Sequence, residues 1–150
     1  MLIGKLIKRE RSKNLVNTVL DSSAVLALLF DEPTAGVVED IIAKAADEKK
    51  DVLINVVNWA EVLYKVNQIQ GKAGIAAAKQ LESESSLKVV DVDCDLAEDA
   101  ALLKAEYNIP LADSFCAALA LKYKAVLVTG DMDFKPLERV LKKIIWLKKE

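Results

Sequence analysis

The chain has 150 residues, of which 53% are hydrophobic and 29% charged, and its formal net charge is −2. This composition fits one globular domain with a sizeable core and excludes a long disordered chain. The N-terminal stretch lacks the apolar region of a signal peptide, and no apolar run approaches the ~20 residues of a membrane span. We therefore expect a cytoplasmic protein with no membrane association.

Short runs rich in β-branched residues alternate with longer segments of helical periodicity. Strands are predicted at 17–20, 52–57, 88–92, 125–129 and 144–147. Helices are predicted at 23–30, 34–48, 58–70, 73–85, 95–107 and 111–123. The strand runs are continuously apolar, which is typical of a parallel sheet buried on both faces. The alternation predicts an α/β domain with three layers (α/β/α) around a mostly parallel five-stranded sheet.

Basic residues gather near the two ends of the chain. The N-terminal cluster is Lys5, Lys8, Arg9, Arg11 and Lys13, and the C-terminal cluster is Arg139, Lys142, Lys143, Lys148 and Lys149. Such clusters can follow phosphates whatever the net charge. Solvated termini explain them equally well. Residues 1–16 form a basic extension before the first strand, and the sequence permits an arm, an extra helix or an element exchanged in a dimer.

Four acids lie beside apolar stretches in a chain that has no histidine: Asp21, Glu61, Asp113 and Asp131. In an open parallel sheet, ligands bind beyond the carboxyl ends of the strands. Asp21 follows the first strand, Glu61 lies in the first turn of a helix after the second strand, and Asp131 follows the fourth strand. We expect these three at one edge of the sheet. Two helices precede the fourth strand, so alternation alone does not place Asp113 there.

Each acid also has a purely structural explanation. Asp21 would cap a helix, Asp113 would favour a helix dipole, and the other two would lie in a turn or on the surface. Three acids at one edge by chance is the weaker explanation. Without histidine there is no imidazole for acid–base chemistry near neutral pH. Converging carboxylates instead form an oxygen-rich site suited to Mg²⁺ or Mn²⁺, ions that activate water for attack on a phosphate.

Several neighbours of the acids are candidates for supporting roles. The hydroxyls of Ser22, Ser23 and Thr129 are placed to orient water or the metal ligands. Asp133 is interpreted as a structural residue that fixes the turn before Phe134. Cys94 and Cys116 form no CxxC pair, which argues against zinc and fits a reducing cytoplasm. Cys116 is expected to be a buried thiol.

The segments around the four acids resemble the PIN domain in order and approximate spacing, and the VapC-type toxins of prokaryotic toxin–antitoxin pairs in particular. These segments are 19–24, 58–62, 111–114 and 128–134, and the resemblance extends over 17–148. It implies a PIN-like nuclease domain at 17–150. It also implies that the matching acids bind Mg²⁺ or Mn²⁺, and that a metal-bound water cleaves RNA to leave a 5′-phosphate and a 3′-hydroxyl. Asn58 matches a polar position common in the family.

The same resemblance implies a homodimer and a small antitoxin partner whose tail enters the acidic cleft. Two features depart from the family pattern. The first acid usually lies within the first ten residues, whereas here sixteen residues precede the strand, which reflects either an altered dimer or a start site assigned too early. The motifs also contain no obvious basic residue, which leaves RNA contacts to the rest of the surface.

Other classes of protein remain as alternatives. One is an inactive PIN domain that binds RNA or protein, although the presence of all four acids argues against it. A phospho-acceptor receiver domain would need paired acids after the first strand and a lysine after the fifth. A phosphatase of the haloacid dehalogenase type would need Asp-x-Asp, where this chain has Asp21–Ser22–Ser23.

Overall fold

The computed structural model describes residues 15–148. Its elements are β1 Leu15–Leu20, α2 Ser22–Leu29, α3 Ala35–Asp47, β2 Lys50–Asn55, α4 Val56–Glu84, β3 Leu87–Val90, α5 Cys94–Tyr107, α6 Leu111–Tyr123, β4 Val126–Thr129, the 3₁₀ helix η1 Met132–Leu137 and β5 Ile144–Trp146. Most of the predicted basic extension, 1–14, lies outside the described residues. Within residues 15–148, no helix is long and apolar enough to cross a membrane.

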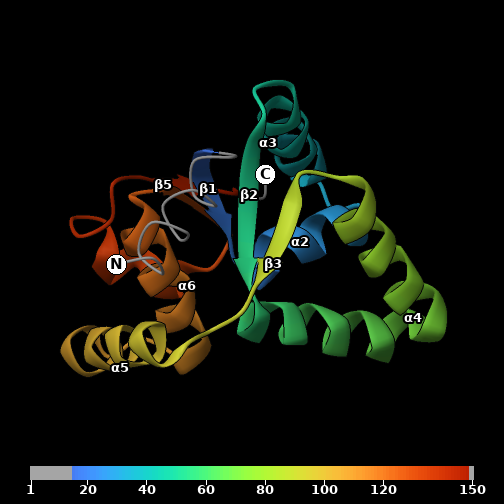
Figure 1. Cartoon of the computed structure of the whole chain (residues 1–150). Coiled ribbons are helices and arrows are strands. Elements are labelled where there is room, and N and C mark those ends of the chain that lie inside the picture. The colour runs from blue at the N-terminus through green and yellow to red at the C-terminus, as the bar shows by residue number, and fades with distance from the viewer. Residues whose placement is uncertain (1–14, 149–150) are drawn as a thin grey trace, which may run out of the picture.

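The five strands form one sheet in the order β3-β2-β1-β4-β5, and every neighbouring pair is parallel. Helices cover both faces, with α2, α3 and α4 on one side and α5 and α6 on the other (Figure 1). Successive strand residues enter opposite cores, because side chains alternate across a sheet. Val19 belongs to the core under α6, whereas Leu20 belongs to the core under α2 and α4. The predicted three-layer α/β fold is confirmed.

The second strand ends earlier than predicted. β2 stops at Asn55, and the predicted strand residues Val56 and Val57 instead open helix α4. The side chain of Asn55 accepts a hydrogen bond from the backbone N–H of Asn58 and so caps the helix. A cap of this kind satisfies one of the free N–H groups of the first turn, and it outweighs the strand preference of two valines.

The two helices predicted at 58–70 and 73–85 are the two parts of α4, which changes direction at Gly71 (Figure 1). Gly71 has φ 61° and ψ −142°, a conformation that glycine adopts without the penalty of a side chain. Gly74 lies close to the preceding part of the helix, and a Cβ at this position would be 2.6 Å from the carbonyl oxygen of Val66. The two glycines therefore permit the bend and its tight packing.

Two consecutive helices, α5 and α6, connect β3 to β4. Helix α5 packs against α6, and α6 lies against β1, β2 and β4. The connection therefore uses α5 as an outer layer and α6 as the covering helix. This arrangement brings the start of α6, with Asp113, to the carboxyl edge of the sheet. Cys116 of α6 is buried, as predicted, and Cys94 is exposed.

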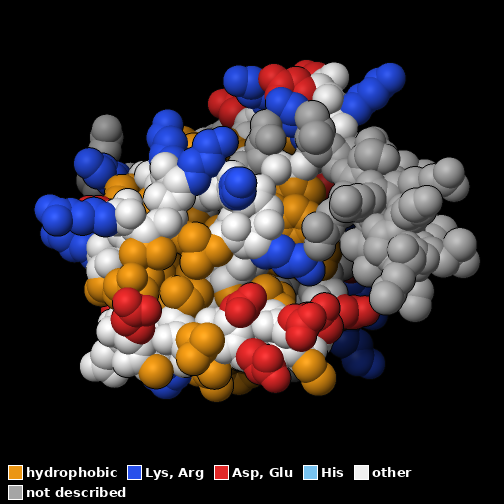
Figure 2. Space-filling view, turned by 60° about the vertical axis from the view of Figure 1, so that its left-hand side comes forward, with side chains coloured by type: hydrophobic (Ala, Val, Ile, Leu, Met, Phe, Trp, Pro, Cys, Tyr) orange, Lys and Arg blue, Asp and Glu red, His pale blue; other side chains and the backbone are white. Residues whose placement is uncertain are grey.

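Charge is unevenly distributed over the face that carries α5. Figure 2 shows acidic side chains along the lower part of this face, hydrophobic side chains above them, and lysine or arginine side chains beyond. The exposed acids of α5 include Asp95, Glu98, Asp99 and Glu106. These acids lie on the outer helix, and they are distinct from the acids at the sheet edge.

Candidate metal centre

Asp21 follows β1 directly and caps helix α2. Its Oδ1 accepts hydrogen bonds from the Ser23 hydroxyl (2.7 Å) and the Ala24 backbone N–H (3.1 Å), and its Oδ2 accepts one from the Thr129 hydroxyl (2.6 Å). The side chain is buried. Burial raises the pKa of Asp21 to about 6, although the three hydrogen bonds oppose this shift. Asp21 therefore caps α2, and the same carboxylate lies at the edge of the sheet where the sequence predicts a site.

The end of β4 is tied to the same carboxylate. The Thr129 hydroxyl donates to Asp21 and accepts from the backbone N–H of Asp131 at 2.9 Å. The hydroxyl of Ser23 accepts from the backbone N–H of Gly130 at 3.0 Å. Within residues 15–148, the Ser22 hydroxyl takes no part in this network. Of the three hydroxyls predicted to have a supporting role, those of Ser23 and Thr129 thus donate to Asp21, and among the described residues that of Ser22 does not.

Asp113 lies in the first turn of α6 and is 8% exposed. Its Oδ2 is buried and has no hydrogen-bond partner among the described residues. Burial raises the pKa of Asp113 to about 8, with further contributions from the charges of Asp131, Asp21, Asp133 and Glu61. Asp113, which the alternation of strands leaves unplaced, has a carboxylate oxygen within 4.8 Å of those of Asp131 and Asp133, and it therefore lies at the sheet edge.

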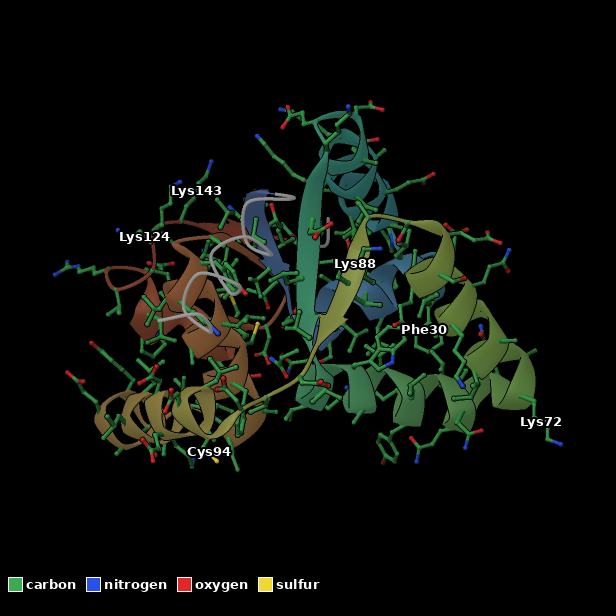
Figure 3. The ribbon with its side chains drawn as sticks, in the orientation of Figure 1. Phe30, Lys72, Lys88, Cys94, Lys124 and Lys143 are labelled. Atoms are coloured by element: carbon green, nitrogen blue, oxygen red, sulfur yellow. The ribbon has the colours of Figure 1, made fainter. Side chains whose placement is uncertain are left out.

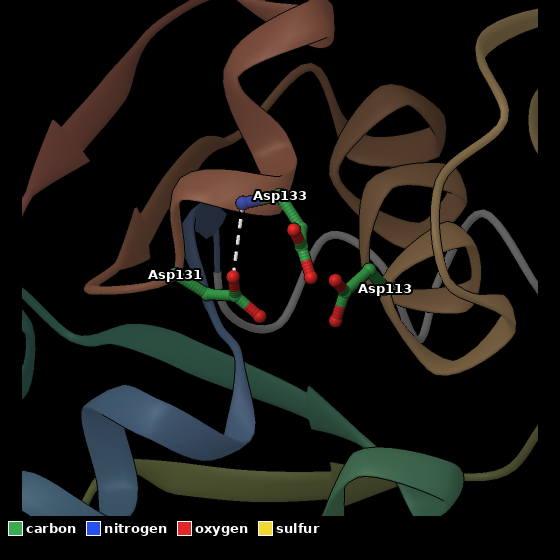
Figure 4. A group of neighbouring side chains, drawn as sticks. All are labelled: Asp113, Asp131 and Asp133. Atoms are coloured by element: carbon green, nitrogen blue, oxygen red, sulfur yellow. Dashed lines mark hydrogen bonds between the residues drawn. The ribbon is translucent and has the colours of Figure 1, made fainter.

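Asp133, the second acid of the 128–134 segment, lies close to Asp113 and Asp131. Asp113, Asp131 and Asp133 each offer a carboxylate oxygen, and these three oxygens lie within 4.8 Å of one another (Figure 4). The side chain of Asp131 accepts the backbone N–H of Asp133 at 2.9 Å and so closes the turn. The carboxylate of Asp133 points toward Asp113 (Figure 4). The interpretation of Asp133 as a turn residue had not anticipated this proximity.

Glu61 is half-buried and is held by an amide network at the start of α4. The side-chain amide of Asn58 donates to Glu61 Oε1 at 3.1 Å and to the Ala112 carbonyl at 3.2 Å. Asn58 in turn accepts a hydrogen bond of 2.6 Å from the side chain of Asn55. Both asparagines are fully buried. The network joins Glu61 to the backbone next to Asp113, and it includes Asn55, which sequence reasoning had assigned to the interior of a strand.

The cluster fits a divalent cation. It consists of five acids, Asp21, Glu61, Asp113, Asp131 and Asp133. Among the described residues, none of these acids forms an ion pair with lysine or arginine. A buried carboxylate oxygen without a partner costs free energy unless a cation or a proton offsets it. The donors are all hard oxygens, which suit Mg²⁺ or Mn²⁺.

The chain is therefore an α/β domain with a parallel sheet and a candidate metal centre, formed by acids at the carboxyl edge of the sheet. The PIN domain model matches residues 18–140, and the chain belongs to the PIN domain family. No individually curated protein sequence matches the chain.

Solved structures of VapBC and VapC proteins share the fold. VapBC2 from Rickettsia felis, bound to a DNA fragment from its promoter, has a TM-score of 0.70 at 16% identity over 86% of this chain and 97% of its own. VapBC-1 from nontypeable Haemophilus influenzae has 0.67 at 19% identity over 89% of this chain and 100% of its own. VapC20 from Mycobacterium tuberculosis, a toxin that cleaves the sarcin–ricin loop, has 0.65 at 18% identity over 79% and 93%. The predicted PIN-like fold of VapC type is confirmed.

Proposed function

We propose that this protein is an endoribonuclease that depends on Mg²⁺ or Mn²⁺ and acts as the toxin of a toxin–antitoxin pair. The observation that carries the proposal is the buried, unpartnered Oδ2 of Asp113 among four further acids. Membership of the PIN family, whose domains are generally nucleases, supports it. The cleavage of RNA by a protein of the same fold, VapC20, supports RNA as the substrate.

The residues proposed to hold the metal are Asp21, Glu61, Asp113 and Asp131, and the structure adds Asp133 to the candidates. When bound, such an ion supplies positive charge beside the scissile phosphate and lowers the pKa of a water. The acids must be ionised to act as ligands, so metal binding releases the protons that the raised pKa values of Asp21 and Asp113 retain. Thr129 and Ser23 orient Asp21, and Asn58 orients Glu61. Without a cation, the acids would repel the RNA backbone.

The proposal includes partners. A toxin–antitoxin complex from Klebsiella pneumoniae has the same fold, with a TM-score of 0.64 at 18% identity. By analogy we propose a small antitoxin whose tail enters the acidic cleft, a homodimer as the active form, and the cytoplasm as the site of action. A short reading frame directly upstream, encoding a protein that binds this chain, would support the antitoxin.

The decisive experiment is RNA cleavage by the purified, partner-free protein. We expect cleavage with Mg²⁺ or Mn²⁺, products with 5′-phosphate ends, and loss of activity with EDTA and in Asp21→Asn. Glu98→Gln, which alters an exposed acid of α5, is the matched control and should cleave normally. No cleavage with any metal, or undiminished cleavage by Asp21→Asn, would overturn the proposal. Mn²⁺ binding without cleavage of any RNA would favour the inactive binding module instead.

A further inference from the structure

The largest hollow described in the structure opens beside the metal centre. Its volume is about 830 Å³, within the range of ~300–1,000 Å³ typical of small-ligand sites. It shares Ser23, Gly130 and Asp131 with the surroundings of the acids. The rest of its lining is Glu32, Thr34, Met132, Lys135, Glu138, Trp146, Leu147 and Lys148. A ligand in this hollow would therefore lie directly next to the candidate metal centre.

We propose that this hollow is a nucleotide subsite, which holds one nucleotide of single-stranded RNA next to the phosphate that lies at the acids. Trp146 stacks on the base, and Lys135 and Lys148 pair with phosphates. This inference rests on the proposed ribonuclease function and assigns residues that neither the motifs nor the acid cluster identified. Base stacking on aromatic side chains and pairing of phosphates with lysine are the common means of binding single strands.

The sheet register places Trp146 next to the acids. Trp146 of β5 is paired with Thr129 of β4, and the Thr129 hydroxyl donates to Asp21. Neighbouring strands lie ~4.8 Å apart, so the indole starts one strand away from a residue that orients the metal centre. Trp146 is half-buried, and its partial packing against the core limits the conformations that the ring can adopt. An aromatic ring held in this way loses little entropy when a base stacks on it.

The chemistry of the lining favours a nucleotide over other ligands. It combines an indole and the exposed Met132 with two lysines and with three carboxylates, those of Glu32, Asp131 and Glu138. The lysines suit phosphates, the apolar groups suit the face of a base, and a carboxylate can accept from an exocyclic amino group. Two smaller hollows, between α3 and the end of α4 and between α5 and α6, include none of the five acids. The subsite also supplies the basic residues that the motifs lack.

The first test uses the fluorescence of Trp146. The chain has two tryptophans, so Trp59→Phe leaves Trp146 as the only one. Combined with Asp21→Asn to prevent cleavage, this variant is titrated in Mg²⁺ with octanucleotides of A, C or U. We expect saturable quenching as bases stack on the indole. No quenching by any RNA would overturn the proposal, and quenching by the tail of an upstream-encoded antitoxin alone would assign the hollow to a protein partner.

The second test does not disturb the core and compares the two ends of β5. Lys148 follows the strand and lines the hollow. Lys143, which is labelled in Figure 3, precedes the strand at its other end and is not part of the lining. Loss of one phosphate contact should reduce the slope of log Kd against log salt by about 0.7. We expect this change in Lys148→Ala and in Lys135→Ala, and none in the matched control Lys143→Ala. Equal slopes in all three variants would overturn the subsite.

A third variant, Trp146→Leu, keeps an apolar side chain but removes the stacking surface. We expect RNA binding about 5- to 160-fold weaker, the range that loss of one base–aromatic stack produces. The outcomes separate the two proposals. Quenching and altered slopes without cleavage by the wild type would support the subsite and overturn the nuclease. Cleavage with wild-type kcat/KM in Trp146→Leu and Lys148→Ala would support the nuclease and overturn the subsite.

Discussion

Asp21 and Asp113 are buried carboxylates of the same cluster, and their surroundings differ. The Asp21 side, formed by the end of β1, the start of α2 and Thr129, gives the carboxylate three hydrogen bonds. The Asp113 side, formed by the start of α6 and η1, leaves Oδ2 without a partner among residues 15–148 and brings Asp133 close. Hydrogen bonds from the protein stabilise the ionised carboxylate of Asp21, whereas no described group of the protein compensates the charge of an ionised Asp113.

The two sides of the candidate metal centre therefore differ in how their carboxylates are stabilised. Hydrogen bonds to a carboxylate favour its ionised form, and nearby negative charges disfavour it. Burial raises both pKa values: to about 6 for Asp21, where three hydrogen bonds oppose the shift, and to about 8 for Asp113, where the charges of four acids add to it. The cation that we propose for this site would therefore offset more unfavourable charge on the Asp113 side than on the Asp21 side.

The largest effects are expected from Asp113→Asn, which tests this comparison directly. Loss of a proposed ligand should reduce cleavage by at least about 100-fold, more than the typical loss of an outer partner. In EDTA the same variant should unfold at a higher temperature, on the order of 2–4 °C, because it removes a carboxyl whose ionisation is disfavoured in the folded state by burial and by the neighbouring acids. Asp21→Asn should also lose activity but gain no stability, because the Thr129 hydroxyl would face an amide. Equal stabilisation by both variants would contradict the comparison.

The pH dependence of stability sharpens the same contrast. Both carboxyls have folded pKa values above 3.8, so between about pH 4 and pH 8 the folded state binds more protons than the unfolded state. The contribution of the pair to the free energy of unfolding in EDTA should therefore decrease as pH rises through this window. Asp113→Asn should remove the upper part of the decrease, between about pH 6 and pH 8. Urea unfolding across this range measures it, and an unchanged slope in the variant would contradict the assignment.

The sequence predicts much of this arrangement but not all of it. Continuous apolar strands indicated the parallel sheet, and strand ends placed Asp21 and Asp131 at its carboxyl edge. Asp113 was linked to them only by the resemblance, because the stacking of α5 on α6 is a tertiary feature. Asn55 was missed because Val56 and Val57 favour a strand, and a side-chain cap decided otherwise.

Two further features depend on geometry that spacing along the chain does not encode. The position of Asp133 follows from the direction of η1, whose first turn is closed by the side chain of Asp131. The hollow brings together residues from 23 to 148, so no local motif indicates it.

A smaller effect is expected from Asn58→Ala, which acts on Glu61 between the two sides. The change removes the hydrogen bonds to Glu61 and Ala112. It also leaves the buried side-chain NH₂ group of Asn55 without the acceptor that Asn58 provides. We expect a loss of about 1–3 kcal/mol in the free energy of unfolding, the cost of an unpaired buried group. Activity should fall about 10- to 100-fold, as for other residues that orient metal ligands. Asn67→Ala, an exposed change on the same helix, is the control for both measurements.

The smallest effects separate two neighbouring serines and test whether hydrogen bonds organise the Asp21 side. Ser23 donates to Asp21 and accepts from the Gly130 N–H, so Ser23→Ala should cost about 0.5–1.5 kcal/mol of stability. If the same free energy is lost from the transition state because Asp21 is less well oriented, cleavage should slow by roughly 2- to 12-fold. Ser22→Ala should change stability by less than about 0.5 kcal/mol, because within residues 15–148 its hydroxyl bonds to none of these groups. Equal losses of stability in the two variants would mean that the Ser23 hydrogen bond does not stabilise the Asp21 carboxylate. The contrast between the Asp21 side and the Asp113 side would then be wrong.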